Sequence, residues 1–186
     1  WSLTPLYGQQ MQMDSAAIGI LMLIVALGSM ALQWPLGWIS DTVSRRKAIL
    51  WGVGGAAAMA GLIALFRPTG APLYGLLFLF GGFGMPLYSL SVALANDQFE
   101  PREMVRAAGA IVIYYGIGNV IGPILGSQFM RWIGPAGLFL SMGVVLALLI
   151  GFVMLRIALI PALPTRDTSY RVYPRTSATA FQLLRK

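Results

Sequence analysis

The charged residues of this sequence gather in a few short segments, and two of these segments carry opposite charges suited to pairing. Asp41 is followed four and five residues later by Arg45 and Arg46, and Asp97 and Glu100 form an acidic group further along the chain. Ion pairs of this kind form in one conformation and break in another, so they can bias a conformational gate. The alternative is that the basic residues only anchor a loop at lipid headgroups.

A second group of residues is polar but uncharged, and its members stand at helical spacing within apolar stretches. The pairs that would share one helix face at i,i+3 or i,i+4 are Ser29 with Gln33, Tyr88 with Ser91, and Tyr115 with Asn119. Polar side chains inside a bilayer tend to face a bundle interior or a water-filled cavity, so these residues are candidates for a cavity lining. For any single one of them, a hydrogen bond between two helices is the alternative.

Catalytic and metal-binding chemistry is restricted, because the 186 residues include no cysteine and no histidine. Thiolate or imidazole metal sites, a disulfide framework and a histidine-based triad are therefore excluded. We expect no enzyme activity, no metal and no cofactor. The net charge of +7 comes from 13 Lys and Arg against 6 Asp and Glu. In a chain this apolar, such an excess is typical of cytoplasmic loops and does not indicate nucleic-acid binding.

The elements that must position these residues follow from where charge is absent. Hydrophobic residues make up 58% of the chain and charged residues 10%, too few charges for the surface of a soluble domain. A membrane helix needs about 20 mostly apolar residues, and the runs without charge predict five such helices, at 15–40, 48–66, 71–96, 104–130 and 135–158. The predicted fold class is an all-α polytopic membrane protein. It comprises the end of a preceding membrane helix and an outside loop at 1–13, a five-helix bundle at 14–158 and a tail at 159–186.

Orientation follows from the distribution of lysine and arginine. With five helices the loops alternate between two sides, and Arg67 and Arg131 are the two of the 13 basic residues that fall on one side. The positive-inside rule places the other side, including the tail, in the cytoplasm. We expect an integral membrane protein with a cytoplasmic C-terminus. The tail is expected to be flexible and to contact lipid headgroups, with a partner-binding strand or peptide as the alternative.

The segment around Asp41 resembles the signature loop of the major facilitator superfamily. The matching residues, which supply a glycine, a small residue, an aspartate and a basic pair at the family's spacing, are Gly37, Ser40, Asp41, Arg45 and Arg46. Two positions depart from the pattern: Ser44 stands where the family usually has glycine, and Thr42 where a basic residue is frequent. The flanking Gln33 and Pro35 resemble one bacterial group, the YcaD-like transporters, which implies a location in the bacterial inner membrane.

A second and less specific motif lies in the predicted helix at 104–130. Gly118, Gly122 and Gly126 are spaced by four, with Pro123 beside the second of them. Glycines on one helix face let a neighbouring backbone approach closely. The segment resembles the Gly-Pro motif that some antiporters of the superfamily carry on helix 5, which implies a bending or tightly packed helix that seals the pathway on one side. Plain helix packing with a proline kink is the alternative.

The resemblance implies twelve helices in two halves related by pseudo-symmetry, and a secondary transporter that works by alternating access. Because four helices and a short tail follow the signature loop, we expect the C-terminal half, from the end of helix 7 through helices 8 to 12; the N-terminal half is the alternative. Expected partners are the lipid bilayer, a missing half-bundle on the same or a separate chain, and a small-molecule substrate of unknown identity. Asp41, Arg45 and Arg46 would form an inside gate with Asp97 or Glu100.

No predicted helix carries a charged residue at its middle, whereas proton-coupled carriers usually place a titratable group within the membrane. Three explanations stay open: the coupling residue lies in the missing half, transport is uncoupled, or the substrate site is apolar and aromatic. A function of another class also stays open, in which the chain is a non-transporting subunit or scaffold within a larger membrane complex.

Overall fold

A computed structural model of the chain describes residues 2–98 and 103–159. These residues form seven helices and no strand. The helices are α1 (Thr4–Gln10), α2 (Ser15–Thr42), α3 (Arg45–Phe66), α4 (Ala71–Gly84), α5 (Leu87–Gln98), α6 (Met104–Ile133) and α7 (Ala136–Leu159). Five stretches of the described chain are long and apolar enough to cross a membrane, with α4 and α5 together making one of them. The predicted fold class, an all-α polytopic membrane protein, is confirmed.

The segment around the signature loop is more helical than the sequence predicts. A polar loop is expected up to residue 47, but α2 continues through Asp41 to Thr42, and α3 already begins at Arg45. Only Val43 and Ser44 separate the two helices, with Ser44 in extended conformation at the N-cap position. Serine is a frequent N-cap residue, although the Ser44 side chain makes no capping hydrogen bond here. The basic residues therefore occupy the first turn of a helix, in place of a loop.

The predicted single helix at 71–96 is divided into α4 and α5. Pro86 lies at the break, and proline has no N–H to donate to the carbonyl four residues earlier. The helical bonds resume on both sides, since the Met85 N–H donates to the Gly81 carbonyl at 3.0 Å and the Leu90 N–H to the Pro86 carbonyl at 3.0 Å. One membrane span thus contains a break near its middle.

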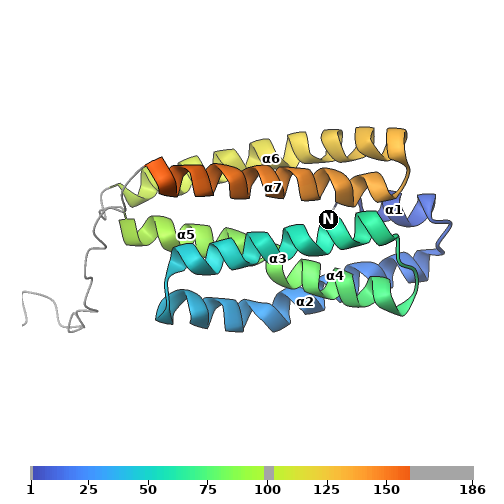
Figure 1. Cartoon of the computed structure of the whole chain (residues 1–186), viewed down its shortest axis with the longest axis horizontal. Helices are drawn as coiled ribbons and strands as arrows, with labels where there is room; N and C mark the ends of the chain where they lie inside the picture. The colour runs from blue at the N-terminus through green and yellow to red at the C-terminus, as the bar shows by residue number, and fades with distance from the viewer. Residues whose placement is uncertain (1, 99–102, 160–186) are drawn as a thin grey trace, which may run out of the picture.

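Figure 1 shows how the helices lie relative to one another. α2 and α4 lie side by side on one side of the bundle, and α6 and α7 lie together on the other. α3 lies between these pairs and contacts α2, α4, α5 and α7. The turns at 11–14, 67–70 and 134–135 lie at one end of the bundle. The turn at 43–44, the ends of α5 and α7 and the start of α6 lie at the other. Connections therefore alternate between the two ends.

The apolar core is unevenly distributed between these ends. The larger cluster joins α1, α2, α3, α4, α6 and α7 near the end that carries the turn at 67–70. It consists of Tyr7, Leu21, Val25, Ile63, Leu73, Leu77, Met130, Leu138 and Phe139. A second buried cluster consists of Leu36, Ala48 and Leu90 and lies toward the other end. Burial of apolar area stabilises the fold in proportion to that area, so the end with the turn at 43–44 is held by less apolar contact.

Candidate functional site

Arg45 is the centre of a charge cluster that joins the ends of three helices. Its guanidinium group forms an ion pair with Asp41 of α2 at 2.8 Å and with Asp97 of α5. It also donates a hydrogen bond to the hydroxyl of Ser40, which is buried, at 3.4 Å. The Arg45 side chain is 27% exposed, whereas those of Asp41 and Asp97 are 65% and 46% exposed. We call Asp41, Arg45 and Asp97 the Arg45 cluster.

The local structure explains why Arg45 needs two acidic neighbours. The first turn of α3 begins with three basic residues, Arg45, Arg46 and Lys47. The N-terminus of a helix carries a partial positive charge from the aligned peptide dipoles, so cations are unfavourable there. The two carboxylates of the Arg45 cluster offset this repulsion. One comes from the preceding helix at i,i+4, and the other lies 52 residues away in sequence.

The other predicted residues of this gate are placed differently. Arg46 is exposed, and within residues 2–98 and 103–159 the ion pairs are those of Arg45 alone. Glu100 lies outside the described residues. Gly37 is half-buried, and no atom of a neighbouring element lies within 4 Å of the position that a Cβ would occupy there. Gly37 therefore makes no close helix contact within the described part of the chain.

Two of the predicted cavity-lining residues meet between α5 and α6. The rings of Tyr88 and Tyr115 have centroids 5.1 Å apart and are tilted by 55°. Both are substantially exposed, at 45% and 57%. Asn119, one turn beyond Tyr115, is exposed as well, and the exposed Ser91 donates its hydroxyl hydrogen to the Leu87 carbonyl at 2.7 Å. This face combines two aromatic rings with hydroxyl and amide groups.

The remaining cavity candidates lie on α2. Ser29 is half-buried and Gln33 is exposed. The hydrogen bonds and ring contacts of the described residues do not join either of them to the tyrosine pair. The structure thus brings together the candidates on α5 and α6, while the assignment of Ser29 and Gln33 to the same cavity stays a prediction.

The glycine motif of α6 is only partly in contact with its surroundings. A Cβ at Gly126 would overlap the side chain of Leu3 and lie in tight contact with that of Leu138, so this glycine lies where α6 meets the N-terminal segment and α7. Gly118 and Gly122 have no neighbouring atom within 4 Å of such a Cβ. Pro123 stands inside α6 without interrupting it. A sealing role for Gly118 and Gly122 would need a partner beyond the described residues, and it stays a prediction.

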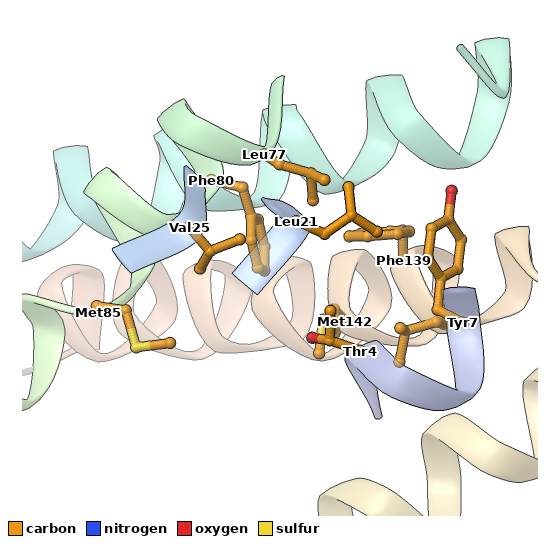
Figure 2. Close-up of a pocket in the computed structure, with 10 residues that line it drawn as sticks. Thr4, Tyr7, Leu21, Val25, Leu77, Phe80, Met85, Phe139 and Met142 are labelled. Carbon is orange, nitrogen blue, oxygen red and sulfur yellow. The ribbon is translucent and has the colours of Figure 1, made fainter. Parts of the chain in front are cut away.

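Sequence reasoning missed a small apolar cavity, which Figure 2 shows among side chains from α1, α2, α4 and α7. Its volume is about 40 Å³, and its lining includes Tyr7, Leu21, Phe80 and Phe139. Phe139 contacts Tyr7 and Phe80 edge to face, with ring centroids 5.2 and 6.0 Å apart. The lining is almost entirely apolar, so residue type alone does not distinguish it from lipid-facing positions. A second cavity, near Arg67, measures about 200 Å³. Ligand pockets usually measure at least about 300 Å³, so both cavities are small for a solute.

Metal chemistry finds no support in the described residues, which contain no group of three or more Asp, Glu, His or Cys able to hold an ion. The described residues do offer ion pairs at one end of the bundle. An exposed aromatic and amide face near its middle adds stacking and hydrogen bonding.

Comparison with known proteins identifies the family. The Major Facilitator Superfamily profile matches residues 1–186. The uncharacterized MFS-type transporter YfkF of Bacillus subtilis (strain 168) is 26% identical over 135 residues, which is 73% of this chain and 34% of that protein. The uncharacterized MFS-type transporter YcaD of Salmonella paratyphi B is 28% identical over 141 residues, which is 70% of this chain and 33% of that protein.

The chain therefore spans about a third of the length of the curated relatives it matches. No solved structure matches it. The YcaD match agrees with the resemblance predicted from Gln33 and Pro35. Since the family profile extends over the whole sequence and the described chain holds five spans apolar enough to cross a bilayer, this integral membrane protein belongs to the major facilitator superfamily.

Proposed function

We propose that the chain is the C-terminal half-bundle of a secondary transporter that moves a small solute across the membrane by alternating access. The names of its relatives and its membership of the superfamily support transport. The chain spans about a third of those relatives, which supports a partial bundle that acts with a second one. The observation that carries the mechanism is the Arg45 cluster, which ties α2, α3 and α5 at one end of the bundle.

The energetics of the Arg45 cluster suit a gate. Ion pairs that are exposed to solvent contribute about 0–1 kcal/mol each, because water and salt screen them. Such pairs can break and re-form without unfolding the helices that carry them. The small apolar cluster at the same end gives little additional resistance, whereas the larger cluster at the opposite end keeps the helices together. We infer that the helix contacts at the end with the Arg45 cluster loosen more readily than those at the other end.

We further propose that the Arg45 cluster lies on the cytoplasmic side of the bacterial inner membrane, with the C-terminus on the same side. The described basic residues at this end are Arg45, Arg46, Lys47, Arg106 and Arg156, and those at the other end are Arg67 and Arg131. The excess agrees with the positive-inside rule. The Arg45 cluster would then be an inside gate that closes when the solute site faces outward.

The test uses the polypeptide as it is made in its native membrane. A screen of radiolabelled solutes in cells that overproduce it identifies a transported compound, and uptake is then compared among variants. Arg45→Ala and Asp97→Asn should each lower the rate of uptake several-fold at unchanged protein level. The exchanged double variant, Arg45→Asp with Asp97→Arg, should recover part of that loss. Arg46→Ala is the matched control, because Arg46 forms no ion pair within the described residues.

Normal uptake by both single variants at normal protein level would rule out the gate. The intact mass of the polypeptide from its native membrane separates the transporter from a non-transporting subunit. A mass near 20.1 kDa, the mass of this sequence, combined with no uptake of any screened solute would favour the subunit. A mass near twice that value or more would favour a complete carrier.

A further inference from the structure

We propose that Tyr88, Tyr115 and Asn119 form a binding surface for an uncharged planar solute with one hydrogen-bonding group. This inference rests on the proposed transport function, because it assigns the solute of that transporter to a chemical class. The tyrosine pair joins α5 to α6, and Asn119 lies one helical turn from Tyr115 on the same face. We call these three residues the tyrosine platform.

The first step concerns polar groups without partners. Within the described residues, no hydrogen bond joins the phenol hydroxyls of Tyr88 and Tyr115 or the amide of Asn119 to another protein group. Tyr115 and Asn119 lie near the middle of α6, and Tyr88 lies just past the break in the α4–α5 span. At that depth the side chains are too short to reach the headgroups. Because hydrocarbon does not satisfy polar groups, a face that gathers three of them is better suited to water or a solute than to acyl chains.

The second step concerns charge. The sequence has no charged residue between Arg67 and Asp97, nor between Arg106 and Arg131. An ion that reached the tyrosine platform would lose its hydration and find no counter-charge on these helices. The ring faces attract cations, but this attraction is modest beside the cost of removing an ammonium group from water. The described surface therefore favours an uncharged solute over an anion or a cation.

The third step concerns shape. Tyr88 and Tyr115 are 45% and 57% exposed, so each ring keeps a free surface although the two rings contact each other. Aromatic faces bind flat rings by offset or edge-to-face stacking. The Asn119 amide offers two N–H donors and one carbonyl acceptor. The nearby Ser91 hydroxyl already donates to the Leu87 carbonyl, so it can only accept. A flat apolar body with one hydroxyl or carbonyl group satisfies these features together.

The experiment measures equilibrium binding to the natural polypeptide in lipid nanodiscs, with protein-free nanodiscs as the partition control. The probes share one carbon skeleton: 2-naphthol is planar and neutral, decahydro-2-naphthol is neutral but not planar, naphthalene-2-sulfonate is anionic, and 2-naphthyltrimethylammonium is cationic. We expect 2-naphthol to bind at least five-fold more tightly than each of the other three. Weaker or equal binding of 2-naphthol, including no binding above the partition control, would overturn the assigned class.

Variants locate the site. Tyr115→Leu and Tyr88→Leu should each weaken 2-naphthol binding several-fold, and Tyr115→Phe, which keeps the ring, should retain most of it. Tyr114→Leu is the matched control, because Tyr114 is 74% exposed on α6 but points to a different side of the helix. Equal losses for the variants at 114 and 115 would overturn the location. The Tm of each variant shows whether a loss reflects misfolding, and the ring-retaining variant keeps the test informative if Tyr115→Leu does not fold.

This binding measurement does not depend on transport, so its failure is distinct from failure of the proposed function. Uptake of a charged solute that responds to the Arg45 variants but not to the Tyr115 variants would overturn the tyrosine platform and leave the gate intact. Binding of 2-naphthol that requires Tyr115, together with normal uptake by the Arg45 variants, would overturn the gate and leave the platform intact.

Discussion

Gly28 of α2 lies so close to Phe78 of α4 that a Cβ at position 28 would overlap the Phe78 carbonyl oxygen. The contact is reciprocal, because a Cβ at Gly81 of α4 would overlap the carbonyl oxygen of Val25 in α2. Gly82 lies against the Gly28 carbonyl in the same way, because a Cβ at position 82 would lie 2.9 Å from that oxygen. Small residues let membrane helices approach this closely, and weak Cα–H···O contacts then add to the packing.

Alanine at these positions should destabilise the bundle. Gly28→Ala and Gly81→Ala each add a methyl group where a backbone carbonyl stands, and α2 and α4 must separate to make room. Overpacking usually costs about 1–3 kcal/mol, and a rigid backbone places these sites at the upper end or above. The Tm of the purified protein in detergent should fall by several degrees, or the protein level should drop. A glycine-to-alanine series compared by thermal unfolding checks this.

The same two helices supply matched controls. Gly19 of α2 and Gly75 of α4 have no neighbouring atom within 4 Å of the position that a Cβ would occupy. Gly19→Ala and Gly75→Ala should leave the Tm unchanged or raise it, because alanine is favoured over glycine inside helices by about 0.5–1 kcal/mol. A fall in Tm as large as that of Gly28→Ala would show that the close contact is not the cause.

A second glycine contact, between α3 and α4, should be relieved by a compensating change. A Cβ at Gly55 would lie 2.6–2.7 Å from three ring atoms of Phe83. Gly55→Ala should therefore lower the Tm, while the double variant with Phe83→Leu should lose less stability than the sum of the two single variants. Coupling energies between contacting residues are about 0.5–3 kcal/mol. Additive losses in a double-mutant cycle would contradict the contact.

These glycines show which part of the fold can be predicted from the sequence. Charge-free runs indicate the membrane helices because charge in hydrocarbon is unfavourable. Helical spacing indicates which residues share a face, but not which face meets another helix. Gly118 and Gly122 stand out by their spacing, yet Gly28 and Gly81 make the tight contacts. Nothing in the local sequence around Gly28 indicates that α4 lies beside it.

The candidate site likewise contains one part that the sequence predicts and one part that depends on how the helices pack. The sequence predicts that Asp41, Arg45 and Arg46 pair with Asp97 or Glu100, because these groups lie on one side of the membrane; the structure joins Arg45 to both Asp41 and Asp97. The choice of Asp97 as the distant partner depends on how α5 packs after the break at Pro86, which the sequence alone does not specify. The contact of Tyr88 with Tyr115 likewise depends on the placement of two helices.

The proposed orientation can be tested with single cysteines, because the 186-residue sequence contains none. Val43 and Thr69 are both exposed and lie in turns at opposite ends of the bundle. In intact cells, a membrane-impermeant maleimide should label Thr69→Cys and spare Val43→Cys. After permeabilisation both should react at similar rates. The reverse pattern would place the Arg45 cluster outside the cell, and the inside gate would then be wrong.

The break between α4 and α5 should matter more for transport than for stability. Pro86 cannot donate to the Gly82 carbonyl, so α5 takes its own direction and carries both Tyr88 and Asp97. Pro86→Ala restores that donor and should let α4 and α5 join into one straighter helix. Removing a proline from a helix interior gains up to about 3 kcal/mol, partly offset here because Pro86 is buried and its ring leaves a small void. The Tm should therefore hold or rise.

Uptake should fall several-fold in the same variant, because a joined helix shifts Asp97 away from Arg45 and Tyr88 away from Tyr115. Pro72→Ala is the matched control, since Pro72 lies in the first turn of α4, where a missing N–H leaves no bond unmade. It should change neither Tm nor uptake. Cysteines placed at 88 and 115 report the geometry directly, because cross-linking between them should slow in the Pro86→Ala background. Unchanged cross-linking with unchanged uptake would mean that the break has no part in positioning α5.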